Sequence, residues 1–219
     1  MRKQVVILGS GGFAREVWAM IDSMNRATDL KKWEVVGWIS SESDPPSGYA
    51  DPILGNDAWA VEHLSRDVEL VLGMGNTALR RKLWELYHSV GFLFPSLIDP
   101  AARISSRVSL GPGSILTAGC TCTTDIEIGI GALINLHCTI GHDAVIEDFV
   151  VLSPGVHVSG GVRIGTGSEV GSGAVILPGL RLGPNSIIGA GAVVTKSLPG
   201  HETYVGIPAR PVAKLPPEG

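Results

Sequence analysis

The sequence predicts a Rossmann-like α/β domain followed by a parallel β-helix, and three observations lead to this prediction. An apolar residue recurs every six positions over residues 104–199, and residues 1–97 lack this period. Near the N-terminus a glycine-rich turn follows a short apolar run, as it does in a βαβ unit. The two patterns meet in the proline-containing segment 94–100, so we divide the chain into residues 1–97 and residues 98–219.

The six-residue period predicts the β-helix. Its anchors are Ile104, Leu110, Leu116, Cys122, Ile128, Ile134, Ile140, Ile146, Leu152, Val158, Ile164, Val170, Ile176, Leu182, Ile188 and Val194. Neither an α-helix nor an alternating strand has a period of six, whereas a short strand plus a turn does when the unit repeats. Three such units make a coil of about 18 residues, and coils stack about 4.8 Å apart. The sixteen hexads therefore predict a little more than five coils.

The first 97 residues predict a parallel sheet with flanking helices. The expected elements are a strand over 5–8, a turn over 9–14, a helix to residue 24, strands over 35–39 and 68–72, and a helix over 80–90. A glycine-rich turn lets a phosphate approach a helix N-terminus. Ala14 takes the place of the third glycine of the G-x-G-x-x-G pattern, so a tight turn without a ligand remains an alternative.

Composition excludes several classes of function. Charged residues make up 17% of the chain, the net charge is −4, and the longest basic run is Arg80-Arg81-Lys82, which argues against nucleic acid as a partner. No apolar run approaches the roughly 20 residues of a membrane span, and Gly9 to Gly12 interrupt the N-terminal apolar run before a signal peptide could form. We therefore expect a soluble cytoplasmic protein without a membrane span.

Four segments resemble the PglD/NeuD-type sugar acetyltransferases, which carry hexapeptide repeats. They are residues 9–16 (GSGGFARE), 73–76 (GMGN), 140–148 (IGHDAVIED) and 205–210 (VGIPAR). The resemblance implies a left-handed β-helix, a nucleotide-sugar site in the first domain, and acetyl-CoA bound between subunits of a homotrimer. It implies an acetyl-CoA-dependent N-acetyltransferase for the amino group of a nucleotide-linked 4-amino-4,6-dideoxy sugar. The alternative within this type is an O-acetyltransferase for sialic acid or another glycan.

The resemblance also implies where the substrates bind. The expected nucleotide-sugar residues are Gly11, Gly12, Phe13, Ser40, Ser41, Gly75, Asn76 and Asn135, and the expected cofactor residues are Gly160, Ser172 and Ala190. Ser172 and Ala190 are 18 positions apart and so lie on one track along the β-helix. The chain departs from the pattern at Asp99 and Val151, where many members have a histidine.

The catalytic candidates are His142 and Asp143. Transfer of an acetyl group to an amine needs a base, and histidine ordinarily titrates near neutral pH. Asp143 is expected to orient the imidazole. Gly160 follows His142 by 18 positions, and we expect its backbone N–H to contact the thioester oxygen.

Two other chemistries are disfavoured. Cys120, Cys122 and Cys138 occupy inward positions of the repeat, which argues against an acyl-cysteine intermediate. No His-x-x-x-His spacing supports a zinc site, and we expect no metal. A non-enzymatic solenoid, either a scaffold or an ice-binding surface, is the remaining alternative.

Overall fold

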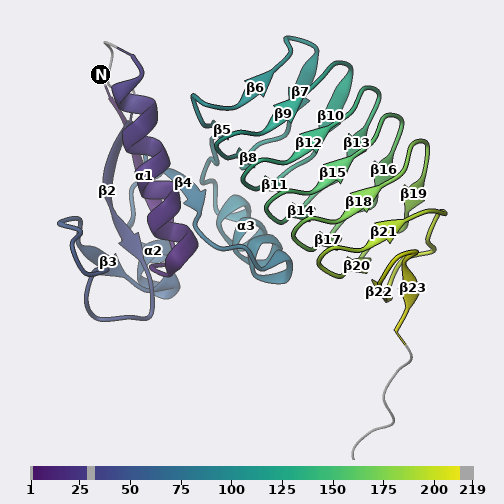
Figure 1. Ribbon diagram of the computed structural model, residues 1–219. Coiled ribbons are helices and arrows are strands. Elements are labelled where there is room, and N and C mark those ends of the chain that lie inside the picture. Colours follow the sequence, from purple (N-terminus) through teal and green to yellow (C-terminus); the bar gives the residue numbers. More distant parts are fainter. Residues whose placement is uncertain (1, 29–32, 213–219) are drawn as a thin grey trace, which may run out of the picture.

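The computed structural model describes residues 2–28 and 33–212, which form an α/β domain beside a β-helix (Figure 1). The α/β domain contains β1 (Lys3–Leu8), α1 (Gly12–Arg26), β2 (Trp33–Ile39), β3 (Ile53–Gly55), α2 (Asp57–His63), β4 (Glu69–Leu72) and α3 (Thr77–Ser89). Its strands are parallel in the order β3-β2-β1-β4. The predicted fold class is confirmed, with β3 and α2 as elements that the sequence interpretation missed.

The sheet of the α/β domain is covered on both sides. Residues Val5 to Leu8 of β1 are fully buried, as expected for a central parallel strand. The buried side chains of α1 include Ala14, Val17 and Ile21, which recur with helical spacing and form one apolar face. Burial of this face fixes α1, and hence the glycine-rich turn before it, against the carboxyl end of β1.

The β-helix has three faces, each a ladder of short strands that are 18 residues apart as far as residue 194, and the last two strands of face 1 depart from this spacing. Face 1 contains β5 (Leu97–Ile98), β8 (Ile115–Leu116), β11 (Leu133–Ile134), β14 (Val151–Leu152), β17 (Glu169–Val170), β20 (Ile187–Ile188), β22 (Thr203–Val205) and the antiparallel β23 (Arg210–Pro211). Face 2 contains β6 (Arg103–Ile104), β9 (Thr121–Cys122), β12 (Thr139–Ile140), β15 (His157–Val158), β18 (Val175–Ile176) and β21 (Val193–Val194). Face 3 contains β7 (Val108–Leu110), β10 (Ile126–Ile128), β13 (Val145–Ile146), β16 (Arg163–Ile164) and β19 (Arg181–Leu182). We name the edges by the faces that they join.

The last residue of almost every two-residue strand points into the β-helix. Leu133 pairs with Ile115 and Val151, and Ile134 pairs with Leu116 and Leu152, so identical positions of the repeat stack. The inward residues form one continuous apolar core along the β-helix. The observed register therefore matches the anchors that the six-residue period predicted.

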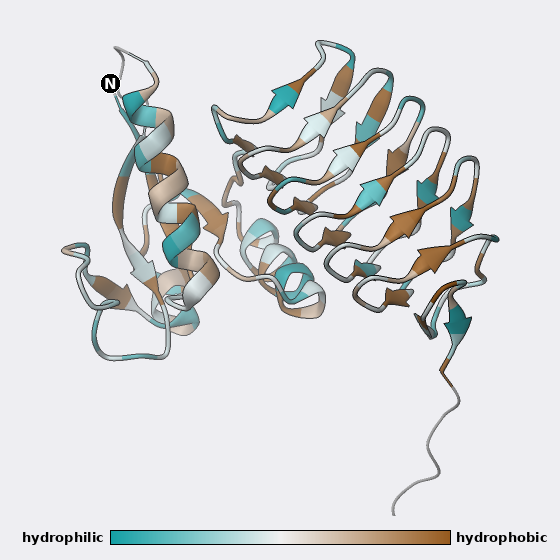
Figure 2. Cartoon of the chain, in the orientation of Figure 1, coloured by the Kyte–Doolittle hydropathy of each residue, from teal (hydrophilic) through white to brown (hydrophobic). Residues whose placement is uncertain are grey.

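Face 1 carries the α/β domain. Its outward residues Leu97, Ile115, Leu133 and Val151 are apolar and buried in one cluster with residues of β1 and α1. Figure 2 shows the corresponding strands β5, β8, β11 and β14 as hydrophobic. The edge between faces 2 and 3 is consequently the one turned away from the α/β domain (Figure 1).

Arg80 joins the two parts of the molecule. Its guanidinium is fully buried and donates to the carbonyl oxygens of Leu72 (3.1 Å), Met74 (2.8 Å) and Gly131 (3.0 Å). Burial lowers the pKa of Arg80 to about 9. Since Leu72 ends β4, Met74 follows it and Gly131 belongs to the β-helix, Arg80 fixes the orientation of the α/β domain.

On the outside of the β-helix, Glu147 ties adjacent coils together. Its carboxylate accepts hydrogen bonds from Arg163 Nε (2.7 Å), the Thr166 backbone N–H (2.9 Å) and the Thr166 hydroxyl (3.0 Å). Partial burial opposes ionisation, but these hydrogen bonds outweigh it and hold the pKa of Glu147 below its ordinary value.

The first strand of the β-helix, β5, contains both Leu97 and Ile98, so the division between residues 97 and 98 stays a prediction. Within the described ranges, each helix is too short or too polar to cross a bilayer.

Candidate functional site

The carboxyl ends of three strands meet beside the start of α1. The Gly9 N–H donates to the Ile39 carbonyl oxygen of β2 (2.8 Å), and the Gly73 N–H donates to the Leu8 carbonyl oxygen of β1 (2.9 Å). The hydroxyls of Ser10 and Ser40 lie 2.8 Å apart. Because β1 lies between β2 and β4, this is the switch point of the sheet, where parallel α/β proteins bind their ligands.

The N-terminus of α1 is open. Gly11 precedes the helix, and no side chain among the described residues caps it. A Cβ atom at Gly11 would meet nothing within 4 Å, and one at Gly12 would approach only a guanidinium nitrogen of Arg15, at 3.9 Å. The unpaired N–H groups of this turn, with Arg15 beside them, form an arrangement suited to a phosphate group.

Sequence reasoning missed Arg15. The residue lies in the first turn of α1, where a positive charge opposes the helix dipole unless an anion binds there. A basic residue at this position after a glycine-rich turn was the available signal.

With the exception of Asn135, the other predicted nucleotide-sugar residues lie around the same strand ends. Phe13 is half-buried at the start of α1, and Ser41 is exposed directly after Ser40. Gly75 follows β4 and has open space around it, while the Asn76 side chain accepts from the Leu79 N–H (2.8 Å) and so caps α3. The structure thus brings these residues together, with Asn76 already engaged in a helix cap.

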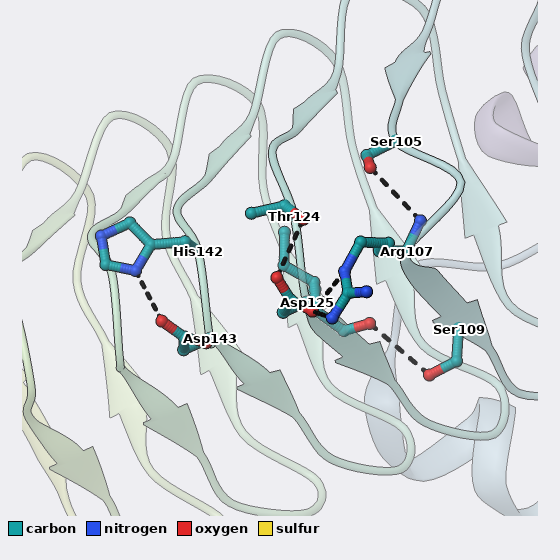
Figure 3. Close-up of polar contacts among 8 residues, drawn as sticks. Ser105, Arg107, Ser109, Thr124, Asp125, His142 and Asp143 are labelled. Carbon is teal, nitrogen blue, oxygen red and sulfur yellow. Dashed lines mark hydrogen bonds and ion pairs between the residues drawn. The ribbon is translucent and has the colours of Figure 1, made fainter.

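His142 and Asp143 lie in the turn between β12 and β13, on the edge between faces 2 and 3. His142 Nδ1 is 2.7 Å from Asp143 Oδ2, and both side chains are about two-thirds exposed (68% and 67%) (Figure 3). An ionised carboxylate only accepts hydrogen bonds, so Nδ1 carries the proton and Nε2 presents a lone pair. This arrangement is that of a base with its orienting acid.

Gly160 lies directly against the imidazole from the next coil. A Cβ atom at this position would be 2.6 Å from His142 Nε2 and 2.7 Å from its Cε1. The glycine therefore leaves room for the ring, in addition to the N–H that the sequence interpretation assigned to it.

The two preceding coils contribute an ion pair to the same edge, Arg107 from one coil and Asp125 from the next. The Arg107 guanidinium binds Asp125, and the Thr124 hydroxyl donates to Asp125 (2.9 Å) (Figure 3). These hydrogen bonds hold the pKa of Asp125 below its usual value and raise that of Arg107. Asp125 is therefore neutralised by a cation, whereas Asp143 binds His142.

The predicted cofactor track lies on a different edge. Ser172 and Ala190 are in consecutive turns between faces 1 and 2, where the Gly191 N–H donates to the Ser172 carbonyl oxygen (2.8 Å). Asn135 is also on this edge, and its Oδ1 accepts from the Leu136 N–H (2.8 Å). Within one chain, Asn135, Ser172 and Ala190 are therefore separated from His142 and Gly160 by the width of face 2.

The cysteines and the remaining histidines are not arranged as a site. Cys120, Cys122 and Cys138 point into the core, and burial raises the pKa of Cys122 to about 12. His157 lies on face 2, 2.8 Å from the Thr139 hydroxyl. In the parts of the chain that the structure describes, no three His, Cys, Asp or Glu side chains are grouped to hold a metal ion.

Comparisons with known families agree with this architecture. Residues 4–86 match the PglD N-terminal domain family. Residues 143–178 and 161–196 match the bacterial transferase hexapeptide family, defined by six repeats.

Solved structures match almost the whole chain. The acetyltransferase domain of PglB from Neisseria gonorrhoeae FA1090 is 28% identical over 96% of this chain and 100% of that domain, with a TM-score of 0.89, and has also been solved with acetyl coenzyme A. PerB, a perosamine N-acetyltransferase from Caulobacter crescentus, was solved with CoA and GDP-perosamine; it is 29% identical over 96% and 97% of the two chains, with a TM-score of 0.85. WeeI from Acinetobacter baumannii AYE is 27% identical over 96% of this chain and 100% of the WeeI chain, with a TM-score of 0.79. The resemblance inferred from the four sequence segments is confirmed.

Proposed function

We propose that this chain, a hexapeptide-repeat acyltransferase with a PglD-type N-terminal domain, transfers the acetyl group of acetyl-CoA to the amino group of a nucleotide-linked sugar. The observation that carries the proposal is the exposed His142–Asp143 pair, whose free Nε2 is directed away from the carboxylate. The similarity to PerB, which was solved with CoA and GDP-perosamine, supports both substrates. A 4-amino-4,6-dideoxy sugar is the acceptor that we propose.

The proposed reaction is direct attack in a ternary complex. The amine nitrogen attacks the thioester carbonyl, the C–N bond forms, and the C–S bond breaks as CoA leaves. His142 Nε2 takes a proton from the attacking nitrogen, and the CoA thiolate takes up a proton. Asp143 stabilises the resulting imidazolium, and the Gly160 N–H is the proposed donor to the oxyanion.

The α/β domain is proposed to hold the nucleotide. The diphosphate would bind at Gly11, Gly12 and Phe13, because the first turn of α1 offers free N–H groups. Ser40 and Ser41 would contact the ribose and base from the end of β2. Gly75 and Asn76, at the end of β4, would border the sugar.

A homotrimer in the cytoplasm is the proposed assembly. His142 lies on the edge away from its own α/β domain, whereas the cofactor track with Ser172 and Ala190 lies on the edge beside it. In a ring of three parallel β-helices, the edge that carries His142 in one copy meets the edge that carries Ser172 and Ala190 in the next copy. Acetyl-CoA would bind between these two edges. Sedimentation should give three times the 22.9 kDa of one chain, and a stable single chain would contradict this assembly.

The test of the function is a CoA-thiol release assay with acetyl-CoA. The acceptors are UDP-, GDP- and dTDP-linked 4-amino-4,6-dideoxy sugars, their 4-hydroxy counterparts and sialic acid. We expect release with at least one amino sugar and an N-acetylated product by mass spectrometry. Release only with hydroxyl acceptors would establish the O-acetyltransferase alternative, and release with none would refute the proposal.

A further inference from the structure

Arg80 is a fully buried cation beside the strand ends that form the proposed nucleotide site. Among the described residues, each hydrogen bond of its guanidinium goes to a backbone carbonyl oxygen, and no carboxylate lies within ion-pair distance of it. Carbonyl oxygens satisfy the donors of the guanidinium but leave its charge without a counter-ion. Because a buried charge without an opposite charge is costly, an anion bound nearby would stabilise Arg80.

Two of these hydrogen bonds fix the direction of backbone N–H groups. Nη1 of Arg80 donates to the carbonyl oxygens of both Leu72 (3.1 Å) and Met74 (2.8 Å). The peptide bonds that follow these two residues are trans, so the C=O and N–H bonds of each peptide point in opposite directions. The N–H groups of Gly73 and Gly75 therefore both point away from the guanidinium.

The partner of the Gly73 N–H shows where this direction leads. The Gly73 N–H donates to the carbonyl oxygen of Leu8 (2.9 Å), the last residue of β1. The Gly75 N–H points to the same side two residues later, where β1 has ended and its chain continues into the glycine-rich turn. A Cβ atom at Gly73 would be 2.9 Å from the Cβ atom of Ala14, so the start of α1 lies directly beside this loop.

The Gly75 N–H is free to bind a ligand. No hydrogen bond engages it within the described ranges 2–28 and 33–212. Gly75 is exposed, and a Cβ atom there would meet nothing within 4 Å. The uncapped N–H groups of the first turn of α1 lie beside the same space. Backbone N–H groups gathered in this way favour an anion.

We propose that Arg80 orients and polarises the Gly75 N–H so that it binds the phosphate group that carries the sugar. This inference rests on the proposed nucleotide-linked substrate. In that proposal the diphosphate begins at Gly11 and Gly12, and Gly75 borders the sugar, so the sugar-bearing phosphate lies between these two positions. Arg80 does not touch the substrate and is a positioning residue.

The strength of this effect comes from the charge of Arg80 and from its shape. A peptide whose carbonyl oxygen accepts a hydrogen bond becomes a better donor at its N–H, because hydrogen bonds in a chain polarise one another. The planar guanidinium reaches carbonyl oxygens in different directions at once, at Leu72 and Met74 beside β4 and at Gly131 in the β-helix. The ammonium group of lysine would keep the charge but lacks this fork.

The test measures the binding of nucleotides to Arg80→Met and Arg80→Lys by calorimetry. UDP, GDP and dTDP are first compared on the wild type, and the one that binds most tightly is used together with its monophosphate. Arg80→Met should weaken binding of the diphosphate about ten-fold, because a phosphate loses a polarised donor and a nearby charge. Binding of the monophosphate, which lacks the second phosphate group, should change little. Arg80→Lys should restore part of the lost affinity.

Arg66→Met is the matched control. The Arg66 guanidinium also donates to three carbonyl oxygens, those of Val61, Leu64 and Val90, but it lies before β4, at the opposite end of the sheet. This variant should keep the wild-type preference for the diphosphate over the monophosphate. An equal loss of affinity for both nucleotides in Arg80→Met, or an unchanged preference, would overturn the inference.

Hydrogen exchange in the wild type decides the question if the Arg80 variants misfold. The Gly75 amide, followed by NMR, should exchange rapidly in the free protein and at least about ten-fold more slowly with saturating diphosphate. Saturating monophosphate should leave its exchange rapid. Rapid exchange in the diphosphate complex would overturn the inference. A wild type that binds none of the three diphosphates would instead refute the proposed nucleotide site.

Discussion

Substitution of Gly160 by alanine should displace the proposed catalytic base, His142, without disturbing the fold. The three atoms nearest to the added Cβ all belong to the His142 imidazole, the closest being Nε2 at 2.6 Å. The backbone of Gly160 is not in the left-handed region, so alanine adopts its conformation without strain. The only structural adjustment that we expect is a rotation of the imidazole.

The expected fall in kcat follows from the overlap between the added Cβ atom and the His142 imidazole. Carbon and nitrogen atoms pack about 3.5 Å apart or more, so the ring must move by roughly 1 Å. Such a movement breaks the 2.7 Å alignment with Asp143 and misplaces Nε2. A misplacement of about 1 Å costs on the order of 100-fold in rate, within the range that a positioned base contributes. We expect kcat to fall about 100-fold.

The assay is steady-state CoA release by Gly160→Ala, His142→Ala and the double variant. Alanine retains the backbone N–H, so an oxyanion contact alone predicts little change for Gly160→Ala. If Gly160 makes room for the ring, the substitution should have almost no further effect once His142 is alanine. Wild-type kcat in Gly160→Ala, or an equal loss in both backgrounds, would refute this reasoning, and thermal unfolding of each variant controls for misfolding.

Four further outcomes are expected. His142→Ala should lower kcat by roughly 10²–10⁴-fold with little change in acetyl-CoA affinity, whereas His157→Ala, on face 2, should retain nearly full activity in the same assay. Asp143→Asn should lower kcat less than His142→Ala, because the base remains but loses its anionic partner; a larger loss would contradict the orienting role. Arg80→Met should lower the free energy of unfolding by about 3 kcal/mol in urea titrations, since buried carbonyl oxygens lose their donor, and an unchanged midpoint would count against the interface role. Glu147→Gln should make the free energy of unfolding fall less steeply as the pH is lowered. The Glu147 carboxylate binds a proton at higher pH in the unfolded state than in the folded state, so the wild type loses this stabilisation as the pH falls below the ordinary pKa of glutamate.

The β-helix could be predicted closely because its signal repeats. Each anchor, such as Ile134 or Leu152, ends a short strand and faces the core, as the period requires. The three-residue β3 and the seven-residue α2 were missed, since neither is long enough to show a periodic pattern.

Individual site residues were predictable only where a motif marked them. His142 and Asp143 stand in a recognisable segment, and their contact follows from adjacency in one turn. In the sequence, Arg80 belongs to a short basic run, which is typical of exposed residues. The residues next to it in the sequence do not indicate the carbonyl oxygens that surround its side chain in the structure.

The central claim is that the α/β domain of one copy and His142 of the next complete each site, and mixed trimers test it most directly. Gly11→Asp should place a carboxylate at the proposed diphosphate position while capping α1, and His142→Ala removes the proposed base. Each variant alone should be nearly inactive. In trimers reassembled from equal amounts, about one quarter of the sites pair an intact α/β domain with an intact His142, so about one quarter of wild-type CoA release should return. Mixed trimers that form but remain inactive would contradict the account.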